Sequence, residues 1–256
     1  MKNLTSAQAE SKGHGGKDKL PLALIPAYRP AKELPVFVRT MLKSGAIQGA
    51  IIVDDGSGPE SELVFRQLSR MQGVHMLTHE ENLGKGAALK TGLNFARYNY
   101  PGCSGVVTAD ADGQHDPDDV VKVARELVEH PGYLTLGVRG FDTVVPFRSR
   151  FGNEVTKHVF RVFSGQNVSD TQTGLRGIPM ELIPAFTKLR PNGYDFELAN
   201  LLMCGRLVRP IRELTIRTIY ADGNSSSHFR PMLDSMKIYA VFVRFVGVSL
   251  LSALSV

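Results

Sequence analysis

The chain has 256 residues, of which 43% are hydrophobic and 21% charged, with a formal net charge of +5. This composition excludes a disordered or fibrous protein and supplies enough apolar side chains for one large α/β domain or two small ones. The basic balance favours anionic partners, such as nucleotide phosphates, anionic lipids or nucleic acid, without choosing among them. The two cysteines show no metal-binding or disulfide spacing, which is typical of a reducing compartment.

The first half of the chain predicts alternating strands and helices after a polar tail. Residues 1–19 contain no apolar run and are expected to be disordered. Short apolar runs bounded by turn residues predict four strands, at 20–25, 50–53, 74–77 and 105–108. Helical spacing predicts four helices, at 35–42, 60–71, 86–98 and 117–129. This order predicts a mostly parallel α/β sheet covered by helices on both faces.

The second half is less regular. Its patterns predict a strand at 133–138, helices at 150–163 and 194–203, an extended segment at 170–178, and strands within 207–220. No repeat or long linker interrupts the chain, so residues 20–230 are expected to form one domain. Residues 231–256 are expected to form an amphipathic or membrane-associating segment, because 238–256 is apolar apart from Arg244. A buried core helix is the alternative for this segment.

Two carboxylates follow the strand predicted at 105–108. Asp110 and Asp112 stand at i and i+2, so their side chains point to the same side of an extended chain. Like charges this close are costly unless a cation neutralises them, and Mg²⁺ or Mn²⁺ would do so while also binding substrate phosphates. Ligands of parallel sheets bind at the carboxyl ends of the strands, which favours a metal site here. A solvated turn is the alternative.

Two further motifs follow predicted strands. Asp54 and Asp55 precede a Gly-Ser turn, and carboxylates there are suited to hydrogen bonds from a base or a ribose. Lys85 lies between two glycines just before a predicted helix, where backbone N–H groups and a lysine suit phosphate. The spacing fits neither a Walker loop nor a dinucleotide fingerprint. Taken singly, each motif also reads as an ordinary turn.

The order of these motifs resembles family 2 glycosyltransferases with the GT-A fold. It runs from Pro-Ala-Tyr at 26–28 through DDGS at 54–57, NLGKG at 82–86 and DADGQH at 110–115 to DTQTGLR at 170–176. Within the family, the chain is most similar to the dolichol-phosphate mannose synthase and bacterial polyprenyl-phosphate glycosyltransferase branch, which also carries an arginine like Arg139. The resemblance spans about residues 22–230.

The resemblance implies four groups of site residues. The nucleoside pocket would be lined by Pro26, Ala27, Tyr28, Asp54 and Asp55, with Lys85 near the base or the diphosphate. The metal would be surrounded by Asp110, Asp112 and Gln114, with Asp112 the most direct ligand. The acceptor phosphate would be received by Arg139 together with Arg148 or Arg150. The reacting sugar would lie near Asp170 and Gln172.

The chain departs from the family pattern at several positions, so the pattern does not identify the nucleotide-sugar donor. The family often has Asn-Glu after Pro-Ala-Tyr, and this chain has Arg29-Pro30 instead. The family's Gly-x-Ser-Lys is matched by a segment at 223–228 that has no lysine. His115 has no partner at metal-ligand spacing and is not expected to be a ligand.

The resemblance implies an inverting, metal-dependent transfer of a sugar from a UDP- or GDP-sugar to a polyprenyl phosphate at the cytoplasmic face of a membrane. Such an acceptor is already an anion and needs orientation, which arginine provides, rather than deprotonation. The first alternative is a saccharide hydroxyl acceptor, for which Asp170 would be the general base. The second is a non-catalytic nucleotide-sugar-binding module.

Two further expectations concern partners. Nucleic acid is not expected, because no aromatic residues are interleaved with the basic ones. The stretch 243–247 also resembles the opening of a GtrA-like membrane domain, which would be a partner or a further domain.

Overall fold

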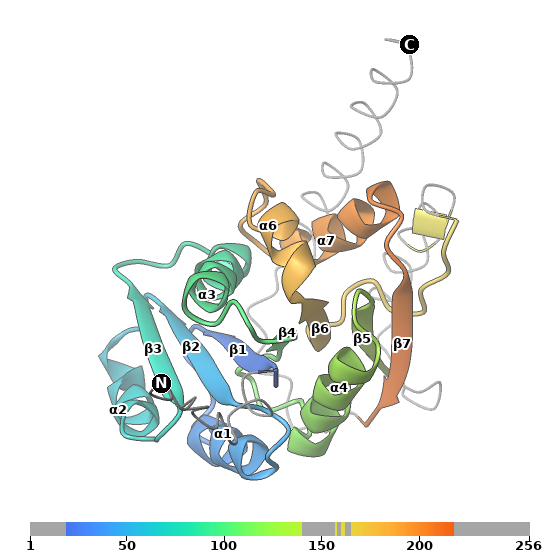
Figure 1. Cartoon of the computed structure of the whole chain (residues 1–256). Helices are drawn as coiled ribbons and strands as arrows, with labels where there is room; N and C mark the ends of the chain where they lie inside the picture. Colours follow the sequence, from blue (N-terminus) through green and yellow to red (C-terminus); the bar gives the residue numbers. More distant parts are fainter. Residues whose placement is uncertain (1–18, 140–156, 158–159, 162–164, 218–256) are drawn as a thin grey trace, which may run out of the picture.

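A seven-stranded β-sheet lies between two layers of helices in the computed structural model, which describes residues 19–139, 157, 160–161 and 165–217 (Figure 1). The strands are β1 (Leu22–Ala27), β2 (Gly49–Asp55), β3 (Val74–His79), β4 (Gly105–Thr108), β5 (Leu134–Arg139), β6 (Arg176–Pro179) and β7 (Ile211–Ile216). The α-helices are α1 (Leu34–Lys43), α2 (Glu62–Ser69), α3 (Lys85–Asn99), α4 (Pro117–Glu129), α6 (Ile183–Phe186) and α7 (Asp195–Arg206). Single 3₁₀ turns precede α2 and α6, at Pro59–Ser61 and Met180–Leu182.

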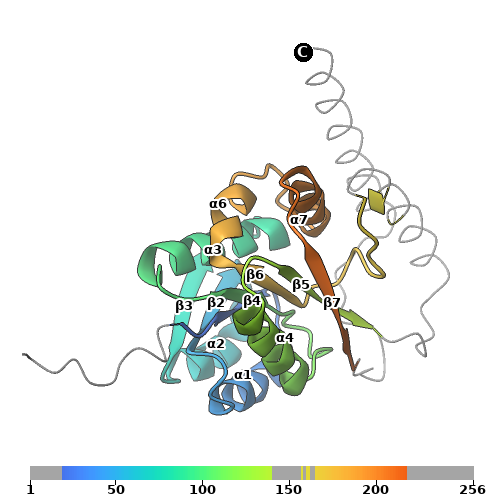
Figure 2. The same cartoon turned by 45° about the vertical axis from the view of Figure 1, so that its right-hand side comes forward.

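The strand order is β3-β2-β1-β4-β6-β5-β7, and β6 alone runs antiparallel to its neighbours. β1 lies between β2 and β4, with Ala27 opposite Asp54 and Leu24 opposite Thr108. The carboxyl ends of these three strands therefore meet at one edge of the sheet. β3 and β7 form the two outer strands, and Figure 2 shows β7 crossing beside β5.

Alternation of side chains along the strands divides the core into two halves. Leu22 and Leu24 of β1 pack with α3, α6 and α7, and Ala23 and Ile25 pack with α1, α2 and α4. Every residue of β1 is buried, as expected for a central parallel strand covered on both faces. The predicted parallel sheet sandwiched by helices is confirmed, and the helix predicted at 117–129 has the observed bounds of α4.

Some predicted elements differ from the structure. The region 207–220 contains only β7 among its described residues, because the Leu207 N–H donates to Met203 O and still belongs to the end of α7. The extended segment predicted at 170–178 is a strand only from Arg176, since the residues before it form a turn. α6 and its 3₁₀ turn were not predicted, because two prolines obscure the helical pattern there.

Several expectations fall outside the described residues. These are the N-terminal tail at 1–18, most of the helix predicted at 150–163, and the segment at 231–256. Within the part of the chain that the structure describes, no helix combines the length and apolar character that a membrane span requires.

Candidate active site

The carboxyl-terminal ends of β1, β2 and β4 form one edge of the sheet, where several of the site residues predicted from the sequence lie close together. Pro26 and Ala27 are buried within β1, and Tyr28 is the first partly exposed residue after it. Asp54, the second-last residue of β2, lies beside Ala27, and Asp110 lies two residues beyond β4. The predicted nucleoside-binding and metal-binding groups thus lie on neighbouring strands of one sheet edge.

Lys85 enters this edge from the start of α3. Gly84, just before it, has φ +99°, and a Cβ there would lie 2.5 Å from Asn192 O, so only glycine allows the approach. The Ala87 N–H donates to Asn192 O, which fixes the start of α3 against the loop before α7. This contact brings Lys85 close to Glu197 in the first turn of α7.

Lys85 bridges two carboxylates. Its Nζ lies 2.6 Å from Asp110 Oδ1 and 2.9 Å from Glu197 Oε1, and 5.6 Å from the centre of the Tyr194 ring. The side chain of Glu197 is only 7% exposed and that of Lys85 only 15%. Asp110 is 27% exposed, so the three charges form a largely buried cluster that joins the loop after β4 to α3 and α7.

Asp110 and Glu197 share the ammonium of Lys85, and their pKa values shift in opposite directions. Burial would raise the pKa of Asp110, but Lys85 and, more weakly, His115 hold it well below its ordinary value. Burial raises the pKa of Glu197, and the positive charges of Lys85 and Arg176 oppose this only partly. The pKa of Lys85 is raised: burial disfavours its charge, but Asp110 and Glu197 together outweigh that effect.

Asp112 has no such partner. Its Oδ1 accepts a hydrogen bond from the Gln114 N–H, and within the described residues it makes no ion pair. Burial and the neighbouring Asp110 raise the pKa of Asp112. A carboxylate that lacks a cation suits a hard divalent ion with oxygen ligands, and the amide oxygen of Gln114 is a ligand of the same kind, so these residues fit Mg²⁺ or Mn²⁺.

Asp54 and Asp55 differ although they are adjacent. Asp55 is 2% exposed, and its carboxylate accepts hydrogen bonds from the Leu83 and Gly84 N–H groups and contacts His79 Nδ1 at 2.7 Å. Asp55 therefore holds the loop that leads to Lys85. Asp54 is only partly buried, and its Oδ1 accepts from the Ser57 N–H. Of the two, Asp54 is the one whose carboxylate can reach a ligand.

Arg29 connects the first two loops of the edge. Its backbone adopts φ +51°, and its N–H donates to Ser57 Oγ at 3.0 Å. Its guanidinium lies 5.2 Å from the centre of the Tyr28 ring and 3.1 Å from Glu60. Arg29, the first of the two residues that stand where the family often has Asn-Glu, thus lies next to the predicted nucleoside pocket.

The turn that carries Asp170 and Gln172 lies against Asp110. Asp170 Oδ1 accepts from the Gln172 N–H, and a Cβ on Gly174 would lie 2.3 Å from Asp110 Oδ2. Thr108 Oγ1 donates to Gly174 O at 2.7 Å, which ties the turn to the end of β4. The structure therefore brings the turn predicted to lie near the sugar next to Asp110 of the Asp110-Ala111-Asp112 sequence, the D-x-D motif.

The predicted acceptor-phosphate residues are only partly described. Arg139 ends β5, two strands from β4. Arg148 and Arg150 lie outside the described residues.

Two residues near the carboxylates were missed from the sequence. Glu197 was not selected, although one acidic residue in the largely apolar stretch 196–202 is a signal that could have identified it. His115 was set aside for lack of a spacing pattern, yet its Nε2 lies 3.5 Å from Asp110 Oδ2 and is buried. Glu197 lies close to Asp110 because the fold brings α7 to this edge of the sheet, whereas His115 follows Asp110 in the same loop.

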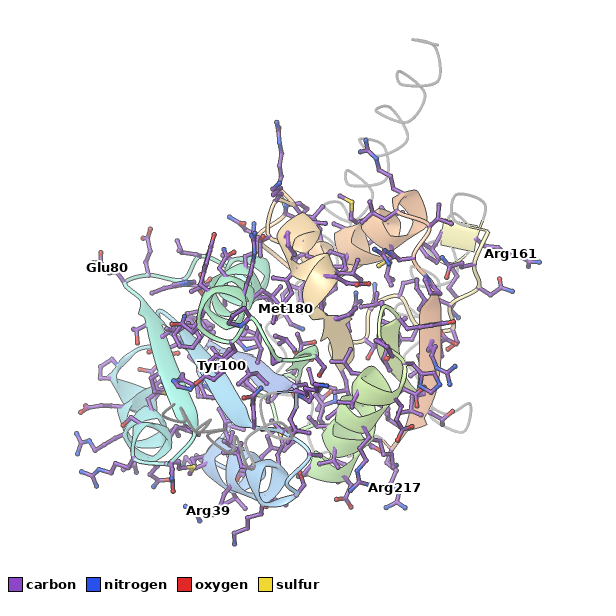
Figure 3. The ribbon with its side chains drawn as sticks, viewed as in Figure 1. Arg39, Glu80, Tyr100, Arg161, Met180 and Arg217 are labelled. Carbon is purple, nitrogen blue, oxygen red and sulfur yellow. The ribbon has the colours of Figure 1, made fainter. Side chains whose placement is uncertain are left out.

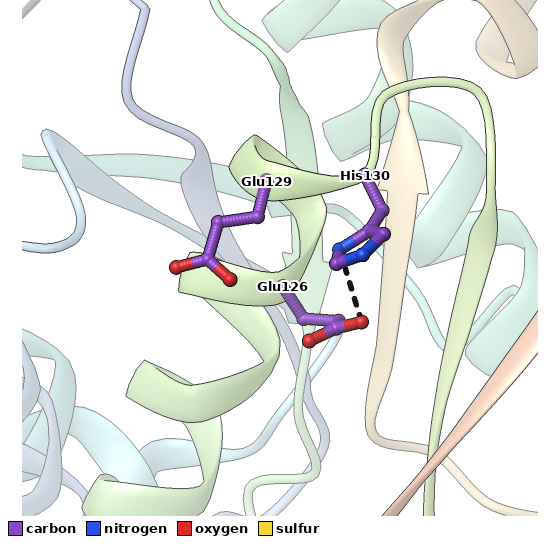
Figure 4. Close-up of side chains that lie close together, drawn as sticks. All are labelled: Glu126, Glu129 and His130. Atoms are coloured by element: carbon purple, nitrogen blue, oxygen red, sulfur yellow. Dashed lines mark ion pairs between the residues drawn. The ribbon is translucent and has the colours of Figure 1, made fainter.

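A second group of metal-type ligands lies at the other edge of the sheet. Glu126, Glu129 and His130 gather at the end of α4, just before β5 begins (Figure 4). Glu126 already pairs with His130 Nδ1 at 3.1 Å and with Arg212. Since Arg212 neutralises the carboxylate that a metal would need, this group is explained as a surface ion-pair network.

Comparisons with known proteins agree with this geometry. The family model "Glycosyl transferase family 2" matches residues 23–183, which is more than half of the chain. UDP-N-acetylglucosamine--dolichyl-phosphate N-acetylglucosaminyltransferase of Methanococcus voltae is 28% identical over 248 residues, covering 90% of this chain and 98% of that protein. Polyprenol monophosphomannose synthase of Mycolicibacterium smegmatis is 24% identical over 185 residues, covering 69% of each chain.

Solved structures show the same fold. Glucosyl-3-phosphoglycerate synthase from Mycobacterium tuberculosis, crystallised with Mn²⁺, UDP and its product, has a TM-score of 0.66 at 16% identity. The match covers 94% of this chain and 87% of that one. The expected GT-A-type sheet is confirmed by this likeness, and the family model together with the curated relatives establishes that the chain is a glycosyltransferase of family 2.

Proposed function

We propose that this chain transfers a sugar from a UDP- or GDP-sugar to a polyprenyl phosphate, with inversion at the anomeric carbon. The observation that carries the proposal is that the two aspartates of the D-x-D motif differ in their charged partners. Asp110 is neutralised by Lys85, whereas Asp112 lacks a cationic partner among the described residues. The relatives named for transfer to dolichyl or polyprenyl phosphate support the choice of acceptor.

In this proposal Asp112, with Gln114, would hold a divalent cation, which would stabilise the charge that develops on the departing nucleotide diphosphate. Tyr28 and Asp54 would bind the nucleoside at the ends of β1 and β2. Lys85 keeps Asp110 ionised and in place, so that the negative edge is ordered before the donor binds.

The acceptor assignment is supported by the acceptors named for the relatives and by the chemistry of a phosphate. A hydroxyl acceptor would need a general base, for which Asp170 is the candidate, because Glu197 is paired with Lys85 and nearly buried. An acceptor phosphate is ionised near neutral pH and only needs to be oriented in line with the donor. Arginine suits that task through its planar guanidinium, and Arg139, which ends β5, would be the candidate.

A polyprenyl acceptor implies a membrane location. We propose that the enzyme works at the cytoplasmic face of a membrane, with residues 231–256 contributing to attachment. This part of the proposal rests on the chemistry of the acceptor and on the apolar sequence of that segment.

The proposal is tested by nucleotide-diphosphate release from a panel of UDP- and GDP-sugars. The purified full chain is assayed with Mn²⁺ or Mg²⁺, with and without polyprenyl phosphate in detergent. We expect release with one nucleotide class that requires both the metal and the lipid. Asp112→Asn should abolish it, whereas Asp118→Asn, an exposed carboxylate in the first turn of α4, should not. Release that is unaffected by chelation or by Asp112→Asn would contradict the proposed role of the metal site.

A further inference from the structure

Arg176 is a charged residue in an unusual position. It is the first residue of β6 and is 1% exposed, the largest fully buried side chain in the described part of the molecule. By contrast, Arg39, Arg161 and Arg217 lie at the periphery, as Figure 3 shows. Burying a guanidinium is costly unless all its donors are used, so its contacts indicate what it stabilises.

The guanidinium of Arg176 binds three backbone carbonyls from two segments. Its Nε donates to Thr173 O at 2.8 Å and its Nη2 to Thr171 O at 3.1 Å. Its Nη1 donates to Glu197 O at 2.6 Å. One rigid fork therefore joins the turn at 170–174 to the first turn of α7. Among the described residues it makes no ion pair with a carboxylate, so its donors serve the backbone.

Each of the two segments carries a part of the candidate site. The turn bears Asp170 and Gln172 and packs through Gly174 against Asp110. The first turn of α7 bears Glu197, which shares Lys85 with Asp110. A change in the separation of these segments would thus move the surroundings of Asp110 from both sides.

We propose that Arg176 is a positioning residue that fixes the Thr171–Thr173 turn relative to Glu197 and thereby holds Asp110 in its working geometry. The structural part of this inference stands on the three hydrogen bonds. Its consequence for the reaction rests on the proposed function.

The decisive variant is Arg176→Lys, which retains the positive charge but loses the planar fork. Hydrogen exchange should become faster, by about tenfold or more, in both 171–175 and 194–198, because both lose a shared anchor. For sugar transfer, kcat should fall about 100-fold, with KM for the donor changed no more than about threefold, since the nucleoside loops lie elsewhere. Arg125→Lys, at an exposed position on α4, is the matched control and should change none of these quantities.

A measurement on the unmodified chain keeps the inference testable if Arg176→Lys does not fold. Native-state exchange in low denaturant should show the two segments opening with the same free energy and the same denaturant dependence. Different opening free energies, or acceleration of only one segment in Arg176→Lys, would overturn the inference. An unchanged kcat in the folded variant would do the same. Exchange does not depend on turnover, so absence of transfer by the wild-type chain would count against the proposed function alone.

Discussion

Lys85 Nζ lies 2.6 Å from Asp110 Oδ1, so the first carboxylate of the D-x-D motif is already paired before any substrate binds. The same ammonium also reaches Glu197. The two aspartates therefore have different roles: Asp110 pairs with Lys85, and Asp112 remains available to bind a cation. The predictions below examine this cluster and the loops that position it.

Removing the ammonium should destabilise the protein. Lys85→Met leaves the buried Glu197 and the partly buried Asp110 without this counter-charge, which should cost about 3–5 kcal/mol of unfolding free energy. Chemical denaturation measures this directly, and Lys43→Met, at an exposed position in α1, is the control. A loss below about 1 kcal/mol would place Lys85 among exposed ion pairs and contradict the buried cluster.

Gly174 should tolerate no side chain. In Gly174→Ala the new Cβ would lie 2.3 Å from Asp110 Oδ2, so either the turn or the carboxylate must move. We expect about 1–3 kcal/mol of destabilisation and a loss of transfer activity of about 100-fold. Gly45→Ala is the comparison, because it has φ +70° but open space around it. That variant should lose about 1–2 kcal/mol and keep its activity, and equal activity losses in both would remove the proposed role of the contact.

The adjacent residues Asp54 and Asp55 should behave differently. Asp55→Ala leaves the Leu83 and Gly84 N–H groups without an acceptor, and each unsatisfied group costs about 1–3 kcal/mol. Asp54→Ala should lower stability little and weaken nucleotide binding. Thermal unfolding and calorimetric titration with UDP and GDP separate the two effects. The reverse pattern would show that the buried position was assigned to the wrong aspartate.

The raised pKa of Glu197 predicts a dependence of stability on pH. A carboxyl whose folded pKa lies above its ordinary value of 4.5 contributes stability that is fully present below that value. This contribution is lost as the pH rises through the folded pKa. Wild type should therefore lose unfolding free energy relative to Glu197→Gln as the pH increases from 4.5 toward neutrality. Glu129→Gln, exposed on α4, should run parallel to wild type, and a difference for Glu197→Gln that is constant with pH would refute the shift.

Local patterns predicted most of the fold and selected the edge of the sheet where the site lies. They succeeded because β1, β2 and β4 are short buried runs, followed by a proline-containing turn after β1 and by glycine-containing turns after β2 and β4. They could not reveal that β6 is antiparallel, since that pairing joins residues far apart in the chain. They also treated Asp54 and Asp55 alike, because only the packing of the Lys85 loop distinguishes two neighbouring carboxylates.

Glu197 and Arg176 illustrate the same limit. Both are buried charged residues, and each has a partner on another element: Lys85 of α3 for Glu197, and the Glu197 carbonyl of α7 for Arg176. Spacing within one segment identifies groups on one strand or helix, whereas a cluster built from three segments depends on the tertiary structure. A buried charge in a predicted core element is the sequence signal that would direct attention to such positions.

The most direct test of the central claim is the identity of the sugar acceptor. The full chain is given the active labelled nucleotide sugar with Mn²⁺ and with polyprenyl phosphate, the corresponding polyprenol, or a soluble saccharide, and the products are separated by chromatography. The account predicts labelled lipid with polyprenyl phosphate alone, and its loss in Asp112→Asn. Transfer to the polyprenol or the saccharide at a comparable rate would contradict it, because the acceptor phosphate would then have no role in the reaction.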